Sequence, residues 1–345
     1  MKGCKYGSHR VLEPKGTLPQ ASWRIDNTME LYDNEILVDV DTLNIDAASF
    51  TQIKKEAKGD NAEIARIMKG IVDSRGKHHN PVTGSGGMFI GTVEAIGLDI
   101  ANIHIKPGDR IASLVSLTLT PLVIDEILEV RQDQDQVSIK GQAILFESGI
   151  YAKLPSDMHP ALALAVLDVA GAPAQTARLV KPGDTVLVIG AGGKSGLLCL
   201  YEAKKRAGVT GKVLGMGHSK ASHDRIVQSG LADHVFSLDA TKPLEVYEKV
   251  SELTSGSLAD VTINCVNIPG TEMASIMATR DEGTVYFFSM ATSFTSCALG
   301  AEGIGKDVNM IIGNGYTKGH AEIALSVLRE SAVLMEMFVE RWAMS

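Results

Sequence analysis

Cysteines and long apolar runs are scarce in this sequence. Only four of its 345 residues are cysteines, and they are Cys4, Cys199, Cys265 and Cys297. They are far apart and none forms a CxxC pair, which excludes a disulfide scaffold and a four-cysteine zinc site. We expect four reduced thiols that are mostly buried.

No apolar run reaches the roughly 18 residues that a membrane-spanning helix requires. The first residues, MKGCKYGSHRVLEPKG, lack the apolar core of a secretory signal. We therefore expect a cytoplasmic protein with no membrane partner.

Basic residues are fewer than acidic residues. The chain carries 33 lysines and arginines against 41 aspartates and glutamates, a formal net charge of -8. A nucleic acid or an anionic membrane is therefore a poor partner. Hydrophobic residues make up 45% of the chain and charged residues 21%, which provides enough apolar material for packed cores. A length of 345 residues fits about two domains.

The periodicity of apolar residues divides the chain into two parts. Residues 1–158 are mostly β, because segments such as EILVDVDTLNI alternate apolar and polar residues as a half-buried strand does. A helical insertion is predicted over about residues 51–78, with apolar residues at Ile64, Ile67, Met68 and Ile71. Over residues 159–318 strands alternate with helices, which predicts an α/β domain with a parallel, doubly wound sheet. Residues 319–345 are expected to form a C-terminal helix, with residues 1–158 as the candidate surface on which it packs back.

The segment VLVIGAGGKSG resembles two nucleotide-binding motifs. A phosphate loop requires the pattern GxxxxGK[ST]. Counting back five residues from Gly193 gives Val188 instead of glycine, which excludes the phosphate-loop motif of kinases and ATPases.

The same segment fits a dinucleotide-binding loop. Gly190 permits the tight turn after the strand, and Gly192 lets the backbone approach a pyrophosphate at the helix N-terminus. The third glycine of the motif is replaced by Ser195, and the adjacent glycines still allow the helix to pack close to the sheet. The predicted cofactor residues of this loop are Gly190, Gly192, Gly193, Lys194, Ser195 and Gly196.

The end of the next strand indicates the type of cofactor. An acid there would bind the adenosine ribose of NAD, but KVLGMGHSKASHDR has none at that point. Polar and basic groups suit a ribose 2'-phosphate, so NADP is favoured, with NAD as the alternative. The residues concerned are His218, Ser219, Lys220 and Arg225. Later strand ends supply Val266, Asn267 and Ser289 as further cofactor contacts.

The whole chain resembles the medium-chain dehydrogenase/reductase superfamily. The matching stretches follow the order of that family over nearly the full length: EILVDVDTLNIDAASF, NPVTGSGGMFIGTVEAIG, IKPGDRIAS, LVKPGDTVLVIGAGGKSG, GLADHVF, DVTINCV and EGTVYFFSM. The resemblance implies a β-rich domain like the GroES co-chaperonin, joined to a Rossmann domain. It also implies a homodimer or homotetramer.

The zinc positions of that superfamily carry unusual residues here. Zinc alcohol dehydrogenases hold the catalytic metal with a cysteine, a histidine and another cysteine or acid. The positions that resemble them are Asp46, Ser85 and Asp168. Two carboxylates and a serine make a poor zinc site, so we expect a zinc-independent member with no bound metal.

Three stretches resemble a narrower family, the L-erythro-3,5-diaminohexanoate dehydrogenases of bacterial lysine fermentation. They are GSHRVLEPKGTLPQASWRIDNTMEL, RGKHHNPVTGSGGM and GAGGKSG. The resemblance implies a small diamino acid substrate and oxidative deamination at a CH–NH2 group. The products would be 5-amino-3-oxohexanoate, ammonia and reduced nicotinamide cofactor.

This chemistry requires a base, because an ammonium cannot release hydride until its nitrogen has lost a proton. We expect one carboxylate among Asp46, Asp168 and Glu147 to be this base, and another to bind the second ammonium. His79, next to His78, is a candidate proton carrier. Ser85 is a candidate hydrogen-bond partner of substrate or cofactor.

Two other functions remain open from the sequence. The first is a zinc-independent NADPH-dependent quinone or enoyl reductase, which shares the fold but needs no carboxylate base. The second is a non-catalytic dinucleotide sensor, which would not require an intact substrate domain.

Overall fold

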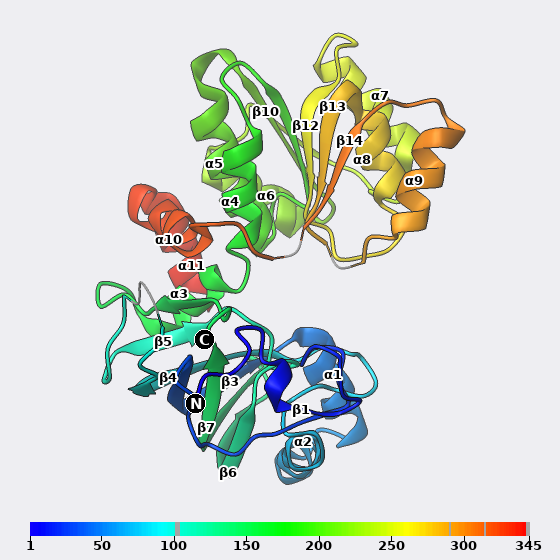
Figure 1. Cartoon of the computed structure of the whole chain (residues 1–345). Coiled ribbons are helices and arrows are strands. Elements are labelled where there is room, and N and C mark those ends of the chain that lie inside the picture. Colours follow the sequence, from blue (N-terminus) through cyan, green and yellow to red (C-terminus); the bar gives the residue numbers. More distant parts are fainter. Residues whose placement is uncertain (101–103, 290, 314, 343–345) are drawn as a thin grey trace. The chain divides into compact units, whose positions relative to one another are not determined.

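The computed structural model describes residues 1–345 except 101–103, 290, 314 and 343–345 (Figure 1). The chain forms two compact units, Met1–Ser156 and Asp157–Ser345. This boundary lies two residues before the one expected from the sequence. Among the described residues, no helix combines the length and apolarity needed to cross a membrane.

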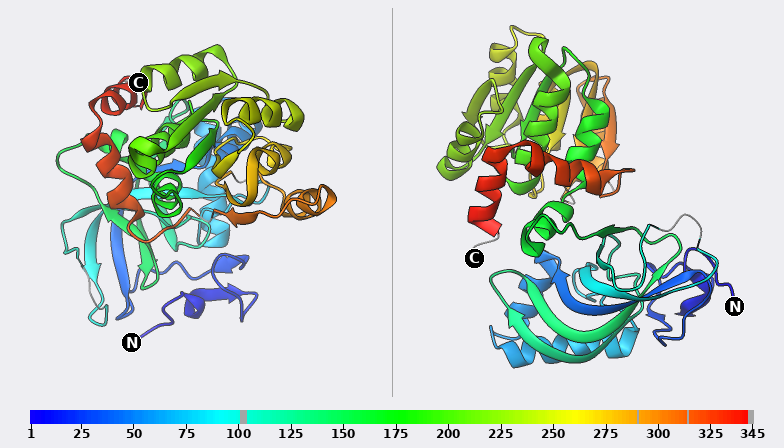
Figure 2. Two further views of the ribbon diagram at one scale, coloured as in Figure 1. Left: turned by 90° about the horizontal axis from the view of Figure 1, so that it is seen from above. Right: turned by 90° about the vertical axis from the view of Figure 1, so that its left-hand side faces the viewer.

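The first unit is built on a six-stranded antiparallel sheet. In spatial order its strands are β6 (Leu122–Arg131), β7 (Gln136–Phe146), β3 (Glu35–Ile45), β4 (Gly87–Ile96), β5 (Arg110–Ser113) and β8 (Tyr151–Lys153). The long strands are strongly curved (Figure 2). In β3, Val38 and Val40 are buried while Asp39 between them is exposed. The alternation in the sequence therefore places one face of this strand in the core.

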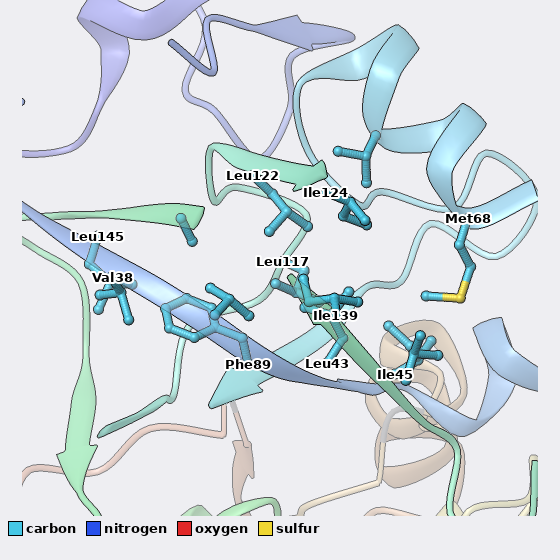
Figure 3. Packing of buried hydrophobic residues seen from close by; sticks show 14 of the residues in the cluster. Val38, Leu43, Ile45, Met68, Phe89, Leu117, Leu122, Ile124, Ile139 and Leu145 are labelled. Atoms are coloured by element: carbon cyan, nitrogen blue, oxygen red, sulfur yellow. The ribbon is translucent and has the colours of Figure 1, made fainter. Parts of the chain in front are cut away.

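Two helices cover the core of this unit. The predicted insertion forms α1 (Ala47–Glu56) and α2 (Asn61–Arg75), separated by a short turn. The Asp60 carboxylate caps α2 by accepting a hydrogen bond of 2.8 Å from the Glu63 amide. Met68 of α2 packs in the same buried cluster as Ile45 and Ile139 (Figure 3).

The N-terminal segment is anchored by a buried ion pair. It contains the short helix η1 (Ser8–Arg10) and a two-stranded sheet of β1 (Val11–Glu13) and β2 (Arg24–Ile25). The Arg10 guanidinium donates to both carboxylate oxygens of Glu35 at 2.7 Å, and both side chains are fully buried. This pair ties the segment to the start of β3.

The second unit is a Rossmann domain, as the sequence predicted. Its six strands are all parallel, in the order β11 (His234–Ser237), β10 (Lys212–Gly217), β9 (Thr185–Ile189), β12 (Ala259–Asn264), β13 (Thr279–Phe287) and β14 (Asn309–Ile312). This is the 3-2-1-4-5-6 order of dinucleotide-binding folds.

Helices lie on both faces of this sheet (Figure 1). Along the chain, the helices of this unit up to the last strand are α3 (Pro160–Leu167), α4 (Gly171–Leu179), α5 (Lys194–Ala207), α6 (Lys220–Ser229), α7 (Pro243–Leu253), α8 (Glu272–Ala278) and α9 (Phe294–Gly303), with the short η2 (Gly208–Thr210) after α5. Helix α5 contacts β9 and β10, and α8 contacts β12 and β13.

The C-terminal helices differ from expectation. Residues 319–345 contain α10 (His320–Glu330) and α11 (Ala332–Trp342), and the last three residues lie outside the described part. Both helices belong to the second unit rather than the first. Helix α10 contacts α3 and α4, and α11 contacts α3 and α6.

Candidate active site and cofactor site

The glycine loop joins β9 to α5 in a tight turn. Gly190 has φ +80°, a backbone conformation that side chains other than glycine rarely adopt. A Cβ at Gly190 would also lie 2.9 Å from a methyl group of Val266. The sequence therefore needs glycine here for both conformation and space.

Two further glycines allow close packing of the loop. A Cβ at Gly192 would lie 2.4 Å from the Ser222 carbonyl oxygen, and one at Gly196 would lie 2.2 Å from the Gly190 carbonyl oxygen. Gly196 thus provides the close contact that Ser195, at the third motif position, does not. Gly193 caps α5, whose first backbone N–H groups have no acceptor within the helix and can bind a pyrophosphate.

A hollow of about 210 Å³ opens at the carboxyl ends of four strands of the second unit. Its lining comes from the ends of β9, β10, β11 and β12, where parallel sheets of this type bind dinucleotides. The lining residues are Ile189, Gly190, Met216, Gly217, His218, Leu238, Asp239, Ala240, Thr241, Val266 and Ile268. Three of the predicted cofactor residues, Gly190, His218 and Val266, are among them.

Asp239 was not anticipated from the sequence. Its carboxylate accepts hydrogen bonds from the backbone and side chain of Thr241 at 2.9 and 2.7 Å. These bonds, together with the charge of nearby His218, lower the pKa of Asp239. The signal that could have found it is its position just after the third strand of the parallel sheet.

The basic residues predicted to select NADP are partly engaged elsewhere. Ser219 caps α6 by accepting from the Ser222 amide at 3.2 Å. Lys220 forms an ion pair with Asp224, and Arg225 donates to the carbonyl oxygen of Gly192 at 2.7 Å. Among the four predicted residues, His218 is the one that lines the hollow.

The last two predicted cofactor residues lie at neighbouring strand ends. Asn267 follows β12 and Ser289 follows β13. The Ser289 hydroxyl donates to the Asn267 side-chain oxygen at 3.4 Å. The structure therefore brings these two residues together, outside the lining of the hollow.

Asp168 and Lys194 form an ion pair of 2.6 Å. Asp168 is the residue that ends α3, and Lys194 is the first residue of α5. Lys194 is half-buried and Asp168 is exposed. Residues predicted separately as a base and a phosphate contact are thus partners in one pair.

Asp46 lies where β3 ends and α1 begins. Its Oδ2 accepts a hydrogen bond of 2.9 Å from the Gly86 amide, and its own amide donates to the Gly86 carbonyl at 3.2 Å. Ser85 is next to Gly86, and its hydroxyl hydrogen-bonds that of Thr83 at 2.9 Å. The structure therefore brings Asp46 and Ser85 together on neighbouring strand ends.

His78 and His79 lie in the loop that leads to Ser85. The His78 ring is fully buried and neither of its nitrogens has a hydrogen-bond partner. Burial lowers the pKa of His78 to about 4, and burial with the nearby Arg75 and Lys77 charges lowers the pKa of His79 to about 4. Both rings are therefore neutral at pH 7. Along this loop His79 precedes Asn80, whose amide donates to the Ser85 carbonyl oxygen at 3.0 Å.

The expectation that Glu147 shares a site with Asp46 is wrong. Phe146 pairs with Glu35 at the start of β3, whereas Ile45 at its other end precedes Asp46. At roughly 3.3 Å per residue, the strand separates the two ends by about 30 Å. Glu147 is exposed and accepts a hydrogen bond from Asn34 at 3.1 Å.

The described residues contain no group of three or more histidines, cysteines, aspartates or glutamates that could hold a metal ion. Asp46 and Ser85, which stand at positions that resemble zinc ligands of the superfamily, supply oxygen atoms. Zinc binds oxygen less well than sulfur and imidazole nitrogen.

Comparison with known families and proteins adds further information. Residues 9–155 match the family model described as the L-erythro-3,5-diaminohexanoate dehydrogenase N-terminal domain. The chain is 61% identical over 339 residues to the L-erythro-3,5-diaminohexanoate dehydrogenase of Acetoanaerobium sticklandii, covering 98% of each chain. It is 57% identical over 340 residues to the protein of that name from Fusobacterium nucleatum, covering 98% of this chain and 99% of the other.

Similarity to solved structures extends to more distant enzymes. A mycobacterial quinone oxidoreductase matches 93% of this chain and 84% of its own, with a TM-score of 0.52 and 19% identity. At that identity the likeness shows the shared fold alone.

Proposed function

The chain belongs to the L-erythro-3,5-diaminohexanoate dehydrogenase family, and on that basis we propose that it oxidatively deaminates L-erythro-3,5-diaminohexanoate. Hydride passes from C3 of the substrate to a nicotinamide dinucleotide. The imine that forms is hydrolysed to 5-amino-3-oxohexanoate and ammonia, a step of lysine fermentation. The 61% identity over nearly the whole chain carries this proposal.

Asp46 is the candidate we favour for the base. Its carboxylate is oriented by the Gly86 amide at 2.9 Å and lies beside Ser85, in the position where related enzymes hold zinc. Asp168 is neutralised by Lys194 at 2.6 Å, so its carboxylate is less available to accept a proton. We assign the Asp168–Lys194 pair to orienting the glycine loop, and Ser85 to hydrogen bonding with substrate.

No metal is needed in this reaction. The lone pair of the deprotonated amine stabilises the cation that forms when hydride leaves, whereas an alcohol must first become an alkoxide, which zinc stabilises. At the positions that resemble zinc ligands of the superfamily, Asp46, Ser85 and Asp168 offer carboxylate and hydroxyl oxygens, which supports a metal-independent reaction. Activity should therefore survive dialysis against a chelator.

For the cofactor, we propose that NADP is accepted in preference to NAD. No acid follows β10, and His218 lines the hollow where the adenosine ribose would bind. Lys220 and Arg225 are engaged by Asp224 and Gly192, so the preference rests on His218 and Ser219. We expect a preference of about tenfold or more, since one hydrogen bond to a charged group contributes about 1.5–3 kcal/mol.

The protein is further proposed to be a cytoplasmic homodimer, with a homotetramer as a higher assembly. β14 is an edge strand of the parallel sheet, and its Met310 and Ile312 are exposed. An exposed apolar edge strand can pair with its copy about a twofold axis.

One assay distinguishes these functions. The purified protein is incubated with NADP or NAD and a panel of β-amino acids, alcohols and quinones, and reduced cofactor is followed by absorbance. Reduction with 3,5-diaminohexanoate alone is the expected result. Turnover of quinones with NADPH, and none of the diamino acid, would identify a reductase, and cofactor binding without any turnover would identify a sensor.

Two substitutions assign the carboxylates. Asp46→Asn should lower kcat by about 10²-fold or more while the Kd for cofactor stays within twofold, because general base catalysis typically contributes 10²–10⁴-fold. Asp168→Asn should lower kcat less. If both variants keep the full rate, the base lies elsewhere.

A further inference from the structure

Four basic residues lie within five positions at the C-terminal end of α2. We call Arg75, Lys77, His78 and His79 the basic cluster. The Arg75 guanidinium lies 4.3 Å from the centre of the Trp23 ring and donates to the carbonyl oxygens of Trp23 and His79 at 3.1 and 2.6 Å. Both acceptors are neutral groups.

Lys77 is the second cation of the basic cluster. Its side chain is fully buried, and Nζ donates to the carbonyl oxygens of Pro19 and Ser22 at 2.5 and 2.7 Å. Over the described part of the chain, no carboxylate pairs with Lys77 or Arg75. Two buried positive charges without a counter-charge favour an anion nearby, because a low-dielectric surrounding strengthens the attraction.

His79 is the member of the basic cluster that can contact a ligand. It is half-buried, and its Nδ1 is covered and makes no hydrogen bond. Nε2 is then the ring nitrogen that can donate to a ligand. The Arg75 guanidinium donates to the His79 carbonyl oxygen at 2.6 Å, so its charge lies beside this residue. Burial, and then the charges of Arg75 and Lys77, lower the pKa of His79. An anion bound to His79 would therefore be stabilised by both cations.

Gly86 is adjacent both to Asp46 and to the backbone of the basic cluster. The Asp46 carboxylate accepts from the Gly86 amide, and a Cβ at Gly86 would lie 2.9 Å from the His78 carbonyl oxygen. The segment that carries the Asp46 carboxylate and the segment that carries the two cations therefore meet at this glycine. Such a charge pattern fits a molecule that has an ammonium and a carboxylate a few bonds apart.

We propose that the basic cluster binds the carboxylate of an amino acid substrate. His79 Nε2 donates a hydrogen bond to it, and the positive charges of Arg75 and Lys77 stabilise it electrostatically. Asp46 then receives the amine end. This inference rests on the proposed function and adds a substrate requirement: a free carboxylate, which a simple amine or an amide lacks. In this assignment His79 is a substrate-binding residue instead of a proton carrier.

The test compares 3,5-diaminohexanoate with its carboxamide, 3,5-diaminohexanamide, in the intact enzyme. With the wild-type protein, KM for the amide should exceed KM for the acid by tenfold or more. His79→Leu should raise KM for the acid about tenfold, leave kcat within twofold, and leave KM for the amide unchanged. This matches the loss of one hydrogen bond to a charged group.

Two matched variants control for packing. His79→Gln retains an N–H donor near the position of Nε2 and should restore most of the affinity for the acid. His104→Leu replaces an exposed histidine of the same unit and should change neither KM. Rescue by Gln but not Leu would separate hydrogen bonding from a merely structural role.

The outcomes are distinct. If the wild-type enzyme turns over neither the acid nor the amide, the proposed function itself is refuted. Turnover of the acid with no change of KM in His79→Leu would overturn the carboxylate assignment alone. A fall in kcat at constant KM would also overturn it, and would make His79 a proton carrier.

Discussion

Acidification should destabilise the first unit through His78. The ring is fully buried without a hydrogen-bond partner, and burial lowers its pKa from the ordinary 6.5 to about 4. Between these values the unfolded chain binds a proton that the folded chain excludes. Stability is therefore complete above pH 6.5 and falls as the pH drops from 6.5 toward 4.

The magnitude follows from the two pKa values. At pH 5 the unfolded histidine is almost fully protonated and the folded one is about one-tenth protonated. The free energy of unfolding should then be about 2 kcal/mol lower than at pH 7.5, from about 1.4 kcal/mol per pKa unit. His79 acts in the same direction, because its pKa is lowered as well.

Tryptophan fluorescence can report on this unit alone. The chain has two tryptophans, Trp23 and Trp342, and Trp23 stacks on Arg75 beside His78. In a Trp342→Phe background, urea unfolding at pH 7.5 and pH 5 would give the stability of the part around Trp23. His78→Met removes the titrating group at similar volume.

The difference between variants decides the prediction. The pH 7.5 to pH 5 loss should be about 2 kcal/mol smaller in His78→Met than in its parent, while the exposed control His104→Gln should match the parent. Equal losses in His78→Met and the parent would refute the reasoning. So would a parent whose stability is flat over this range.

Three further substitutions test other parts of the molecule. Gly192→Ala places a Cβ 2.4 Å from the Ser222 carbonyl oxygen and should weaken cofactor binding at least tenfold by calorimetry; a Kd within twofold would contradict it. Ile312→Lys puts a charge on the exposed edge strand and should convert dimers to monomers in light scattering, whereas an unchanged mass would place the interface elsewhere. Arg10→Met removes the cation that pairs with the buried Glu35 carboxylate, which keeps His9 and the Tyr32 amide as hydrogen-bond partners. The variant should lower stability by about 3 kcal/mol, and a loss below about 1 kcal/mol would be inconsistent.

The second unit could be predicted closely from the sequence because its signals are local. Gly190 and Gly192 follow a short apolar strand, and alternation of strands and helices predicts a parallel sheet. Asp239 was missed because it lines the hollow from a strand that is not adjacent to the glycine loop in sequence. The Asp168–Lys194 pair was missed for the same reason, since 26 residues separate its members.

The first unit was predicted less completely because strand register decides which residues meet. Asp46 and Glu147 both follow strands of one sheet, but those strands are antiparallel, so the residues lie at opposite ends. The burial of Lys77 could not be predicted either, because the residues that cover it, 19–22, are far from it in the sequence. A local pattern of charge gives no measure of such long-range burial.

Asp46 and Ser85 stand at positions that resemble the zinc ligands of the superfamily, and the proposed reaction differs from that of a zinc enzyme in the charge it requires there. A zinc ion stabilises an alkoxide, so a zinc enzyme places positive charge beside the substrate oxygen. An amine arrives as a cation, and hydride can leave only after a base has neutralised it. Under the proposed function, Asp46, held by the Gly86 amide, supplies negative charge for the amine, and the basic cluster, whose His78 backbone also borders Gly86, supplies positive charge for the carboxylate. A carboxylate at a position that resembles a metal ligand, and cations in the adjoining loop, are then parts of one adaptation to a substrate that carries both signs of charge.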